Sequence, residues 1–536
     1  SAGSDTRKYA GLFSFDAMTR GDATPEQLEQ AWYEELVKLQ TEKLPERELR
    51  KVKNRVAASN YRRLENNMSL LIQLAFSEAL LELVTQPLMG ADKVLDELTK
   101  IHHYVYQHLP LGERFWPASM PCIIRGLTNI PIANYGTSNL GMMKTVYRRG
   151  LSNRYGSVMQ SIAGIHFNYS FSSEFWQSYR ELISPEDNDS KGFMDLHYMG
   201  LTRNVLRYGW LIPYLFGASA TVCKSFMHDY HEHTFEEFDD NTLYLPYATS
   251  LRMGDIGYQN SQEDEKGVKA NYNSLCHYIY SLRSAMKTSC EDFEKIGIKK
   301  KGEHLQLNTN ILQIANEYYS SVRPKPILYG NDRPLRALDQ NGIGYIEIRS
   351  LDINPLLEVG IDKEQIQFLE VFLLYCLLED SPTILSSELV EIDSNSQLVA
   401  HKGREPDLKL VNNGKETSLT DWGDNIFAGI KQCSKLLSTD HQQSVDNISL
   451  RIKNPDLTPS AIMLNEMQHQ EMGFFEYTDQ FSRKYQTLYK DKTFANDYFH
   501  ELDEQVISSR NEQLEIESND VMNFDQFLED YFANDA

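Results

Sequence analysis

The sequence is poor in basic residues and lacks the cysteine spacings that hold metal ions or staple small domains. Lysine and arginine together number 53 against 76 aspartates and glutamates, so the net charge is -23. Such a charge repels nucleic-acid phosphates and anionic membrane surfaces unless a local basic patch intervenes. The 6 cysteines are scattered without a C-x-x-C pair. Neither a zinc knuckle nor a disulfide framework is therefore indicated, and a reducing cytoplasm fits best.

A long apolar run is also missing. The most apolar stretch, residues 209–223 (GWLIPYLFGASATVC), is too short to span a bilayer and contains Pro213, which predicts a buried element. The chain begins Ser-Ala-Gly-Ser without the basic-then-apolar order of a signal peptide, and we interpret this start as the end of a fragment. We therefore expect a cytoplasmic protein without a membrane segment.

The composition is that of an ordinary globular enzyme. Of the 536 residues, 41% are hydrophobic and 11% are aromatic, which is enough to bury a large core. The length allows two to four average domains or a single enzyme body with attachments.

The first 75 residues differ in character from the rest. A short apolar strand is predicted at residues 11–15, followed by two helices, of which the first opens with a capping box at Thr24-Pro25. The block resembles a non-catalytic fragment of the insulinase-like (M16-type) zinc peptidases, most clearly over residues 24–64, but it holds no H-x-x-E-H zinc motif. We interpret it as a peptidase-like helical fragment, either a real fusion or a foreign piece.

Beyond this block the pattern changes to mixed α and β. From residue 77 to about residue 463, short apolar strands alternate with helices and glycine-marked turns. Residues 393–420, rich in Ser, Asn, Lys and Glu, are expected to form a turn-rich insertion, and the acidic end from about residue 501 is expected to be helical in part and frayed. The predicted divisions are 1–75, 76–500 and 501–536.

Two strand-like segments carry polar residues on one face and apolar residues on the other. In residues 163–171, His166 shares a polar face and four apolar residues share the opposite face. In residues 345–352, Glu347 and Arg349 project from one surface about 6 to 7 Å apart, a pairing that suits a metal ion and a phosphate together. Taken singly these signals are more often structural, because a strand histidine is commonly a satisfied core residue and a Glu-x-Arg pair a surface ion pair.

Residues 77–84 form an apolar run that is interrupted by Glu78 and Glu82. A strand would place both carboxylates on one face. The alternative is a helix that starts near Tyr61 and continues, without a glycine or proline to stop it, as far as Pro87. That helix would also place the two acids on one face, but it could not pair within a sheet.

Glycine-rich phosphate loops are absent. The sequence has neither G-x-x-x-x-G-K-[ST] nor a convincing G-x-G-x-x-G after a strand. If ATP is bound, metal ions and basic side chains must hold its phosphates. The histidine-rich run at residues 228–233 lies in a polar, acidic segment without the helical spacing of a zinc site, and we interpret it as a solvated loop.

Six stretches together resemble the signature segments of one enzyme family, in family order. They are residues 116–122 (WPASMPC), 135–139 (YGTSN), 147–156 (YRRGLSNRYG), 209–219, 244–252 (YLPYATSLR) and 345–355. By them, residues 76 to about 520 resemble the glutamate-cysteine ligases of the gamma-proteobacterial type. The resemblance implies an α+β fold in which an antiparallel sheet, curved into a funnel like that of glutamine synthetase, is surrounded by helices.

The resemblance also implies a reaction. The γ-carboxylate of L-glutamate attacks the γ-phosphorus of ATP to give γ-glutamyl phosphate, and the amine of L-cysteine then displaces phosphate, which is the first step of glutathione biosynthesis. It implies Mg²⁺ or Mn²⁺ as the metal and ATP as cosubstrate. The implied partners are small-molecule substrates alone, without nucleic acid or membrane, and the implied state is a monomer.

Ten residues match functional positions of the family. Glu82, His166 and Glu347 match the metal ligands, and Arg349 matches the catalytic guanidinium that faces the phosphate. The positions that match the cysteine pocket are Arg252, Tyr258, Tyr319, Tyr147, Leu151 and Gln160. An arginine for the substrate carboxylate and an aromatic wall for a small thiol make chemical sense.

The chain departs from the family pattern before residue 76. The family begins with a strand that bears a Glu-Arg-Glu motif, and it has an aspartate seven residues before the position of Glu82, where this chain has Ala75. The run Glu46-Arg47-Glu48 belongs to the peptidase-like block, and we interpret it as accidental. Three hypotheses stay open: an active ligase, an inactive hybrid or mis-joined chain, and a binding protein whose first block docks a partner.

Overall fold

The computed structural model describes residues 2–5, 12–15, 82–110, 112–124, 130–186, 188–227, 234–257, 269–329, 332–491 and 496–533. The chain divides into two compact units, Ser1–Leu64 and Glu65–Ala536. In the first unit, β1 (Ala2–Asp5) pairs antiparallel with β2 (Leu12–Phe15), which confirms the short strand predicted at residues 11–15. The two helices predicted for this block lie outside the described residues.

The second unit contains the remaining elements. Its helices are α3 (Ala91–His108), α4 (Asn139–Tyr155), α5 (Ser173–Ile183), α6 (Ser190–Tyr208), α7 (Leu211–Phe216), α9 (Leu275–Lys287), α10 (Glu291–Ile296), α11 (Pro334–Asn341), α12 (Lys363–Leu378), α13 (Ser386–Lys402), α14 (Leu419–Ser434), α15 (Thr439–Lys453), α16 (Pro459–Gln470), α17 (Phe474–Asp491), α18 (Asn496–Asn519) and α19 (Phe524–Ala533). Short 3₁₀ turns are η2 (Val158–Ser161), η4 (Leu251–Met253), η5 (Ala315–Glu317) and η6 (Pro455–Leu457). Its strands are β3 (Ile165–Tyr169), β4 (Thr221–Cys223), β5 (Glu236–Glu237), β6 (Thr242–Tyr244), β7 (Lys299–Lys300), β8 (Glu303–His304), β9 (Val322–Lys325), β10 (Tyr345–Leu351), β11 (Lys409–Asn412) and β12 (Lys415–Ser418).

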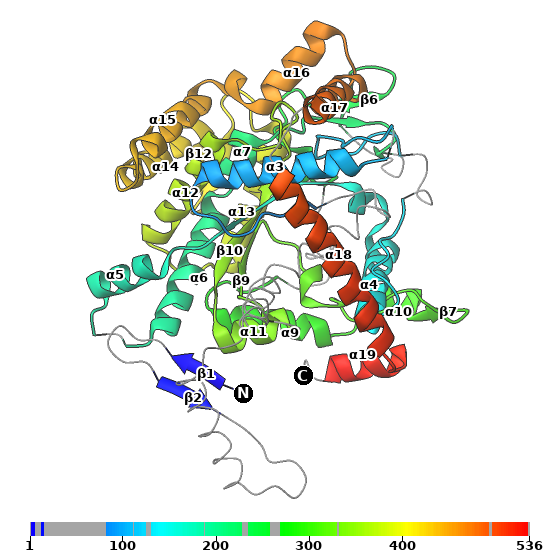
Figure 1. The fold of residues 1–536 in the computed structure, drawn as a ribbon. Helices are drawn as coiled ribbons and strands as arrows, with labels where there is room; N and C mark the ends of the chain where they lie inside the picture. Colours follow the sequence, from blue (N-terminus) through cyan, green and yellow to red (C-terminus); the bar gives the residue numbers. More distant parts are fainter. Residues whose placement is uncertain are drawn as a thin grey trace, which may run out of the picture. The chain divides into compact units, whose positions relative to one another are not determined.

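Three antiparallel strands in the order β3, β10, β9 form the sheet on which the site is built (Figure 1). β10 alternates as the sequence predicts, since Ile346 and Ile348 are buried in the main apolar core while Glu347 points to the opposite face. α6 and α7 contact this sheet on its apolar side. Pro324 lies in β9, an edge strand, where its missing N–H breaks no ladder. Small antiparallel sheets among many helices confirm the α+β class.

α12 is the central helix of the main core. Its sequence KEQIQFLEVFLLYCLL is apolar on nearly every side, and such a helix must be covered all round. α3, α6, α14 and α15 pack against it. Asp362 begins the helix, because its carboxylate accepts the backbone N–H of Gln365 at 2.8 Å. Phe368, Phe372 and Cys376 are 0% exposed, and burial of each large side chain stabilises the fold by about 1.5–3 kcal/mol.

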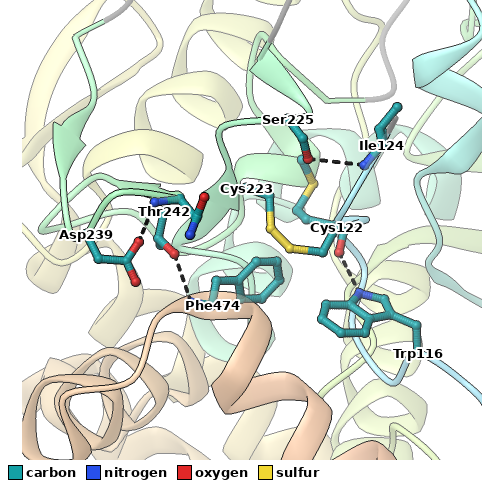
Figure 2. Close-up of a disulfide and its surroundings, with 10 residues drawn as sticks. Trp116, Cys122, Ile124, Cys223, Ser225, Asp239, Thr242 and Phe474 are labelled. Carbon is teal, nitrogen blue, oxygen red and sulfur yellow. Dashed lines mark hydrogen bonds between the residues drawn. A yellow bond between two sulfur atoms is a disulfide. The ribbon is translucent and has the colours of Figure 1, made fainter. Parts of the chain in front are cut away.

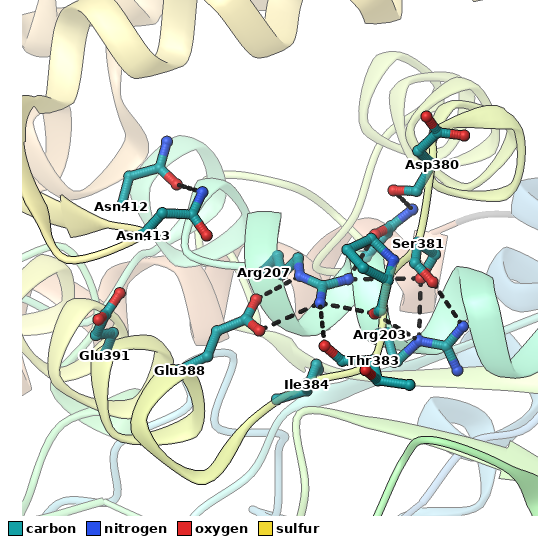
Figure 3. Close-up of polar contacts among 12 residues, drawn as sticks. Arg203, Arg207, Asp380, Ser381, Thr383, Ile384, Glu388, Glu391, Asn412 and Asn413 are labelled. Carbon is teal, nitrogen blue, oxygen red and sulfur yellow. Dashed lines mark hydrogen bonds and ion pairs between the residues drawn. The ribbon is translucent and has the colours of Figure 1, made fainter.

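Two arginines of α6 hold the segment that follows α12 (Figure 3). Arg203 donates to the backbone oxygens of Tyr272 at 3.1 Å and Ser381 at 2.9 Å, and it is only 6% exposed. Arg207 pairs with Glu388 of α13 and donates to the backbone oxygen of Pro382 at 2.8 Å. Backbone carbonyls that lack a strand or helix partner are satisfied in this way.

A disulfide joins Cys122 to Cys223, with their Cα atoms 5.4 Å apart (Figure 2). It lies in a second apolar core, formed by β4, β6 and the helices α16 and α17, and Phe474 packs there. The cysteine spacing indicates no disulfide framework, so it does not predict this bond. The reason is that 101 residues separate the two cysteines, so local spacing gives no sign of the bond. The other four cysteines are free.

Some of the other sequence-based expectations are confirmed and others are wrong. Residues 209–223 form the buried α7 and β4, as predicted. Residues 393–420 are not a turn-rich insertion as a whole, because α13 continues to Lys402 and the β11–β12 hairpin occupies residues 409–418. The turns at residues 403–407 and at Asn413-Gly414, where both φ angles are positive, are of the expected kind. The C-terminal segment is helical as predicted, but Leu528 of α19 is buried against α4 rather than frayed. Among the described helices, none is long and apolar enough to cross a membrane.

Candidate active site

Glu347 lies among basic side chains on the polar face of the central sheet. Its Oε2 is 3.3 Å from Arg349 Nη1 and 3.9 Å from Lys325 Nζ. Arg323 stands directly opposite Glu347 on β9, on the same face. The Glu347 side chain is only 9% exposed. Burial alone would raise the pKa of its carboxyl, but the surrounding positive charges, led by Lys325 and Arg349, lower that pKa to about 2. The carboxyl is therefore ionised at neutral pH.

β3 brings His166 beside this carboxylate. Its Nδ1 lies 3.8 Å from Oε1 of Glu347 and 3.7 Å from Oε1 of Glu82. Burial, followed by the positive charge of Arg349, lowers the pKa of His166 to about 3. The imidazole is therefore neutral at pH 7, with a ring nitrogen between two carboxylate oxygens.

Glu82 comes from an irregular segment. Residues 82–88 are neither strand nor helix, and α3 begins only at Ala91, so neither structure predicted for residues 77–84 includes Glu82. Pro87 disfavours the helical conformation at Gln86, the residue directly before it. Although 61% of the Glu82 side chain is exposed, surrounding protein and then the negative charge of Glu347 raise the pKa of its carboxyl. Glu78 lies outside the described residues.

The three positions matched to metal ligands are thus brought together from three separate parts of the chain. Among the described residues, no group of three or more His, Cys, Asp or Glu side chains is close enough to hold a metal ion as it stands. The chemistry of Glu82, His166 and Glu347 nevertheless fits one. Two carboxylates and a neutral imidazole are ligands that Mn²⁺ accepts, and the carboxylates are ligands for Mg²⁺.

Arg349 links these acids to residues matched to the cysteine pocket. Its guanidinium carbon is 5.6 Å from the ring centre of Tyr319, within the range of a cation–π contact. The hydroxyl of Tyr319 is 3.5 Å from the sulfur of Met253, and Arg252 Nη1 is 3.2 Å from the same sulfur. Arg252 Nη2 donates to the backbone oxygen of Arg349 at 2.6 Å. Arg252, Tyr319 and Arg349 therefore lie together.

The other matched pocket residues belong to α4 and the turn after it. Tyr147 and Leu151 are one helical turn apart, and Leu151 is 5% exposed. Gln160 of η2 is tied to the helix, because its side-chain amide donates to the backbone oxygen of Arg148 at 3.2 Å. Tyr258, the remaining matched position, lies outside the described residues.

A buried ion pair joins α4 to the segment that carries Tyr319. The side chains of Arg154 and Glu317 are both 0% exposed, and their charged atoms are 2.9 Å apart. Glu317 also accepts the Tyr155 hydroxyl at 3.0 Å and the backbone N–H of Gln313 at 2.6 Å. Because Glu317 ends η5 two residues before Tyr319, this pair fixes Tyr319 relative to α4.

The sequence patterns did not single out Arg323 and Lys325, although both face Glu347. Arg323 is 5% exposed, and its Nη2 donates to the backbone oxygen of Asn316 at 3.1 Å. Burial lowers the pKa of Lys325, and the charge of Glu347 opposes that change. The available signal was the alternation of Arg and Lys along VRPK, which puts both side chains on one strand face. The proline between them hid the strand.

Comparison with known proteins decides the family. The sequence model of glutamate-cysteine ligase matches residues 39–399. The chain belongs to the glutamate-cysteine ligase family. This ligase is 41% identical to the glutamate-cysteine ligase of Shewanella halifaxensis over 463 residues, which are 85% of this chain and 88% of the relative. It is 42% identical to that of Pseudomonas putida over 464 residues, which are 86% of this chain and 87% of the relative.

A solved structure agrees with this assignment. The fold of the ligase matches the crystal structure of glutamate-cysteine ligase from Francisella tularensis, in complex with AMP, with a TM-score of 0.80 at 31% identity, covering 86% of this chain and 90% of that chain. It also matches the fold of a bifunctional glutathione synthetase from Pasteurella multocida with a TM-score of 0.59 at 21% identity, covering 77% of this chain and 47% of that chain. As a family member, the chain is an ATP-dependent enzyme that joins L-glutamate to L-cysteine, the first step of glutathione biosynthesis.

Proposed function

We propose that the reaction takes place at the side chains gathered around Glu347. The observation that carries this proposal is the position of the His166 imidazole between the carboxylates of Glu82 and Glu347, at 3.7 and 3.8 Å, with Arg349 and Lys325 beside Glu347. A site for the triphosphate of ATP and a divalent ion needs both kinds of group. Glu82, His166 and Glu347 would hold Mg²⁺ or Mn²⁺, which supplies positive charge against the phosphate oxygens.

In the first step, a γ-carboxylate oxygen of glutamate attacks the γ-phosphorus of ATP. The bond from phosphorus to the bridging oxygen breaks, and ADP leaves with the electron pair. Negative charge is spread over the phosphoryl oxygens, and fixed cations stabilise it most when they are already in place. Arg349 is the catalytic residue of this step, since Glu347 at 3.3 Å and the ring of Tyr319 orient its guanidinium. Arg323 and Lys325 add charge from β9.

In the second step, the amine of cysteine attacks the acyl carbon of γ-glutamyl phosphate. The bond from carbon to the phosphate oxygen breaks, phosphate leaves with the electron pair, and the nitrogen loses a proton as the amide forms. Arg252 binds the cysteine carboxylate by charge-assisted hydrogen bonds. The residues that enclose the cysteine are Tyr147, Leu151, Gln160, Tyr258 and Tyr319.

An ADP-release assay tests the proposal. The full chain should release ADP only when glutamate, cysteine and Mg²⁺ are all present, with one amide product for each ADP. Glu347→Gln should lower kcat by about 100-fold or more, since it removes a metal ligand and the anchor of Arg349. The matched control is Glu416→Gln, which removes an exposed carboxylate of β12, 3.2 Å from Lys409, and should leave the rate unchanged. A chain without cysteine-dependent ADP release would refute the proposal.

One observation favours a second candidate, an inactive hybrid. The sequence holds Glu-Arg-Glu only at residues 46–48, within the peptidase-like block, and Ala75 stands where the family has an aspartate. Each missing carboxylate weakens the grip on the metal. Sequencing across the codons for residues 75–79 separates the two: an uninterrupted reading frame in the transcript counts against a mis-joined chain, and a break at that point supports it.

We also propose that residues 1–75 are a peptidase-like fragment joined to a monomeric, cytoplasmic ligase. Three different positions bear on where the ligase begins. The smaller compact unit ends at Leu64, the family model begins at residue 39, and the ligase signatures begin near residue 76. Sedimentation velocity tests the monomer, and cell fractionation tests the compartment. A variant that begins at residue 76 and keeps full activity would support a foreign block, whereas loss of activity with an intact fold would contradict it.

A further inference from the structure

The central sheet contains an irregularity beside the phosphate-facing arginine. Ile348 pairs with Phe167 and Leu351 with Ile165, so β10 has one residue more than β3 in this interval, which makes a bulge at residues 349–350. The backbone N–H of Arg349 donates to the oxygen of Ser321 at 2.8 Å. The carbonyl of Arg349 accepts the guanidinium of Arg252 at 2.6 Å. The position of the bulge therefore depends on a side chain outside the sheet.

Arg252 is confined on several sides. It is 4% exposed, and its guanidinium lies against the backbone of Gly164, where an added Cβ would overlap it. Gly164 directly precedes β3, which carries His166. Arg252 thus contacts two places: Gly164, just before β3, and the bulge of β10. β3 carries His166, and β10 carries Glu347 and Arg349.

The counter-charge of Arg252 is Asp352, which no step of the proposed mechanism uses. The Asp352 side chain is 0% exposed, with Oδ1 3.7 Å from Arg252 Nη1. It accepts the backbone N–H of Ala218 at 2.9 Å, the hydroxyl of Ser219 at 2.6 Å and the hydroxyl of Ser250 at 2.9 Å. A buried carboxylate without an opposite charge would be costly, so this network exists together with Arg252.

We propose that Asp352 is a positioning residue that holds Arg252 between the two halves of the reaction. The aspartate fixes the guanidinium, which also donates to the carbonyl of Arg349, so that it can bind the carboxylate of the amine substrate. This inference rests on the roles proposed above for Arg252 and Arg349. It assigns to Asp352 the preference for an amine that carries an α-carboxylate.

Asp352→Asn is the test variant, because it keeps the shape and one acceptor oxygen but removes the charge. The steady-state rate is measured with cysteine and with cysteamine, which has the same amine and thiol without the carboxylate. Wild type should prefer cysteine strongly, and Asp352→Asn should lower kcat/KM for cysteine by about 10- to 100-fold while changing the value for cysteamine little. KM for ATP should stay within about twofold. A merely structural role would lower all these rates together.

Two further variants keep the proposal falsifiable. Ser250→Ala removes one hydrogen bond to Asp352 and should shift the ratio of kcat/KM for cysteine to kcat/KM for cysteamine in the same direction by a smaller factor. This variant tests the proposal if Asp352→Asn fails to fold. Asp479→Asn is the matched control, since Asp479 is a buried aspartate on α17 bonded to two arginines, and it should leave the ratio unchanged. A folded Asp352→Asn with the wild-type ratio would overturn the positioning role alone, whereas a wild type without cysteine-dependent turnover would overturn the proposed function and this role with it.

Discussion

Replacing Glu317 by glutamine should destabilise the ligase by about 3–5 kcal/mol. Glu317 and Arg154 are both 0% exposed and 2.9 Å apart, so the change leaves a buried guanidinium without its counter-charge. At an effective dielectric constant of about 20, the lost attraction is about 5–6 kcal/mol before desolvation is counted. The glutamine also has one acceptor oxygen instead of two, although Tyr155 and the backbone N–H of Gln313 both donate to the carboxylate.

Urea denaturation followed by circular dichroism measures this effect. The double variant Arg154→Met with Glu317→Leu removes both charges and should recover at least half of the lost stability, because an apolar pair costs less than a single buried charge. The control Glu291→Gln removes an exposed acid of α10, 3.6 Å from Lys295, and should not change the midpoint. Equal loss in the single and double variants, or a single variant as stable as wild type, would refute the reasoning.

Three other predictions concern separate parts of the ligase. Lys325→Met should lower kcat/KM for ATP by about 100-fold, because it removes a cation 3.9 Å from Glu347. The control Lys224→Met breaks an exposed ion pair and should leave kcat/KM unchanged in the same steady-state measurement. Cys122→Ser should lower the free energy of unfolding by about 2–4 kcal/mol, and a reducing agent should do the same to wild type but nothing more to the variant in thermal melts. Burial alone would raise the pKa of Asp479, but hydrogen bonds from two arginines lower it. The stabilisation by this carboxylate is therefore present above the ordinary aspartate pKa and is lost as the pH falls through the lower, folded-state pKa. In acid unfolding, Asp479→Asn should lose less stability than wild type over that pH interval.

The sequence predicted the polar faces of β3 and β10 because strand alternation is a local property. His166 and Glu347 could be placed on one side of their strands from a few neighbours. Their meeting with Glu82 could not be predicted in this way, because it depends on an irregular segment and on strands that lie far apart in the chain. Family resemblance supplied that pairing, and the structure places the three side chains together.

Long-range features escaped local patterns for the same reason. The disulfide joins cysteines 101 residues apart. The proposed role of Asp352 depends on its contact with Arg252, which belongs to η4, far away in the sequence. The chain from residue 393 was misjudged by composition, because its polar residues cover the outside of α13 while Ile392 and Val399 bury the other side. Polar content alone does not distinguish an amphipathic helix from a loop.

The most direct test of the metal site is a crystal structure of the full chain with Mn²⁺ and a non-hydrolysable ATP analogue. Anomalous scattering locates the ion without reference to the refined side chains. The account predicts a manganese peak within about 2.0–2.6 Å of carboxylate or imidazole atoms of Glu82, His166 and Glu347, with the γ-phosphate beside Arg349. A manganese ion bound elsewhere, with these three side chains turned away from it and from the nucleotide, would contradict the account.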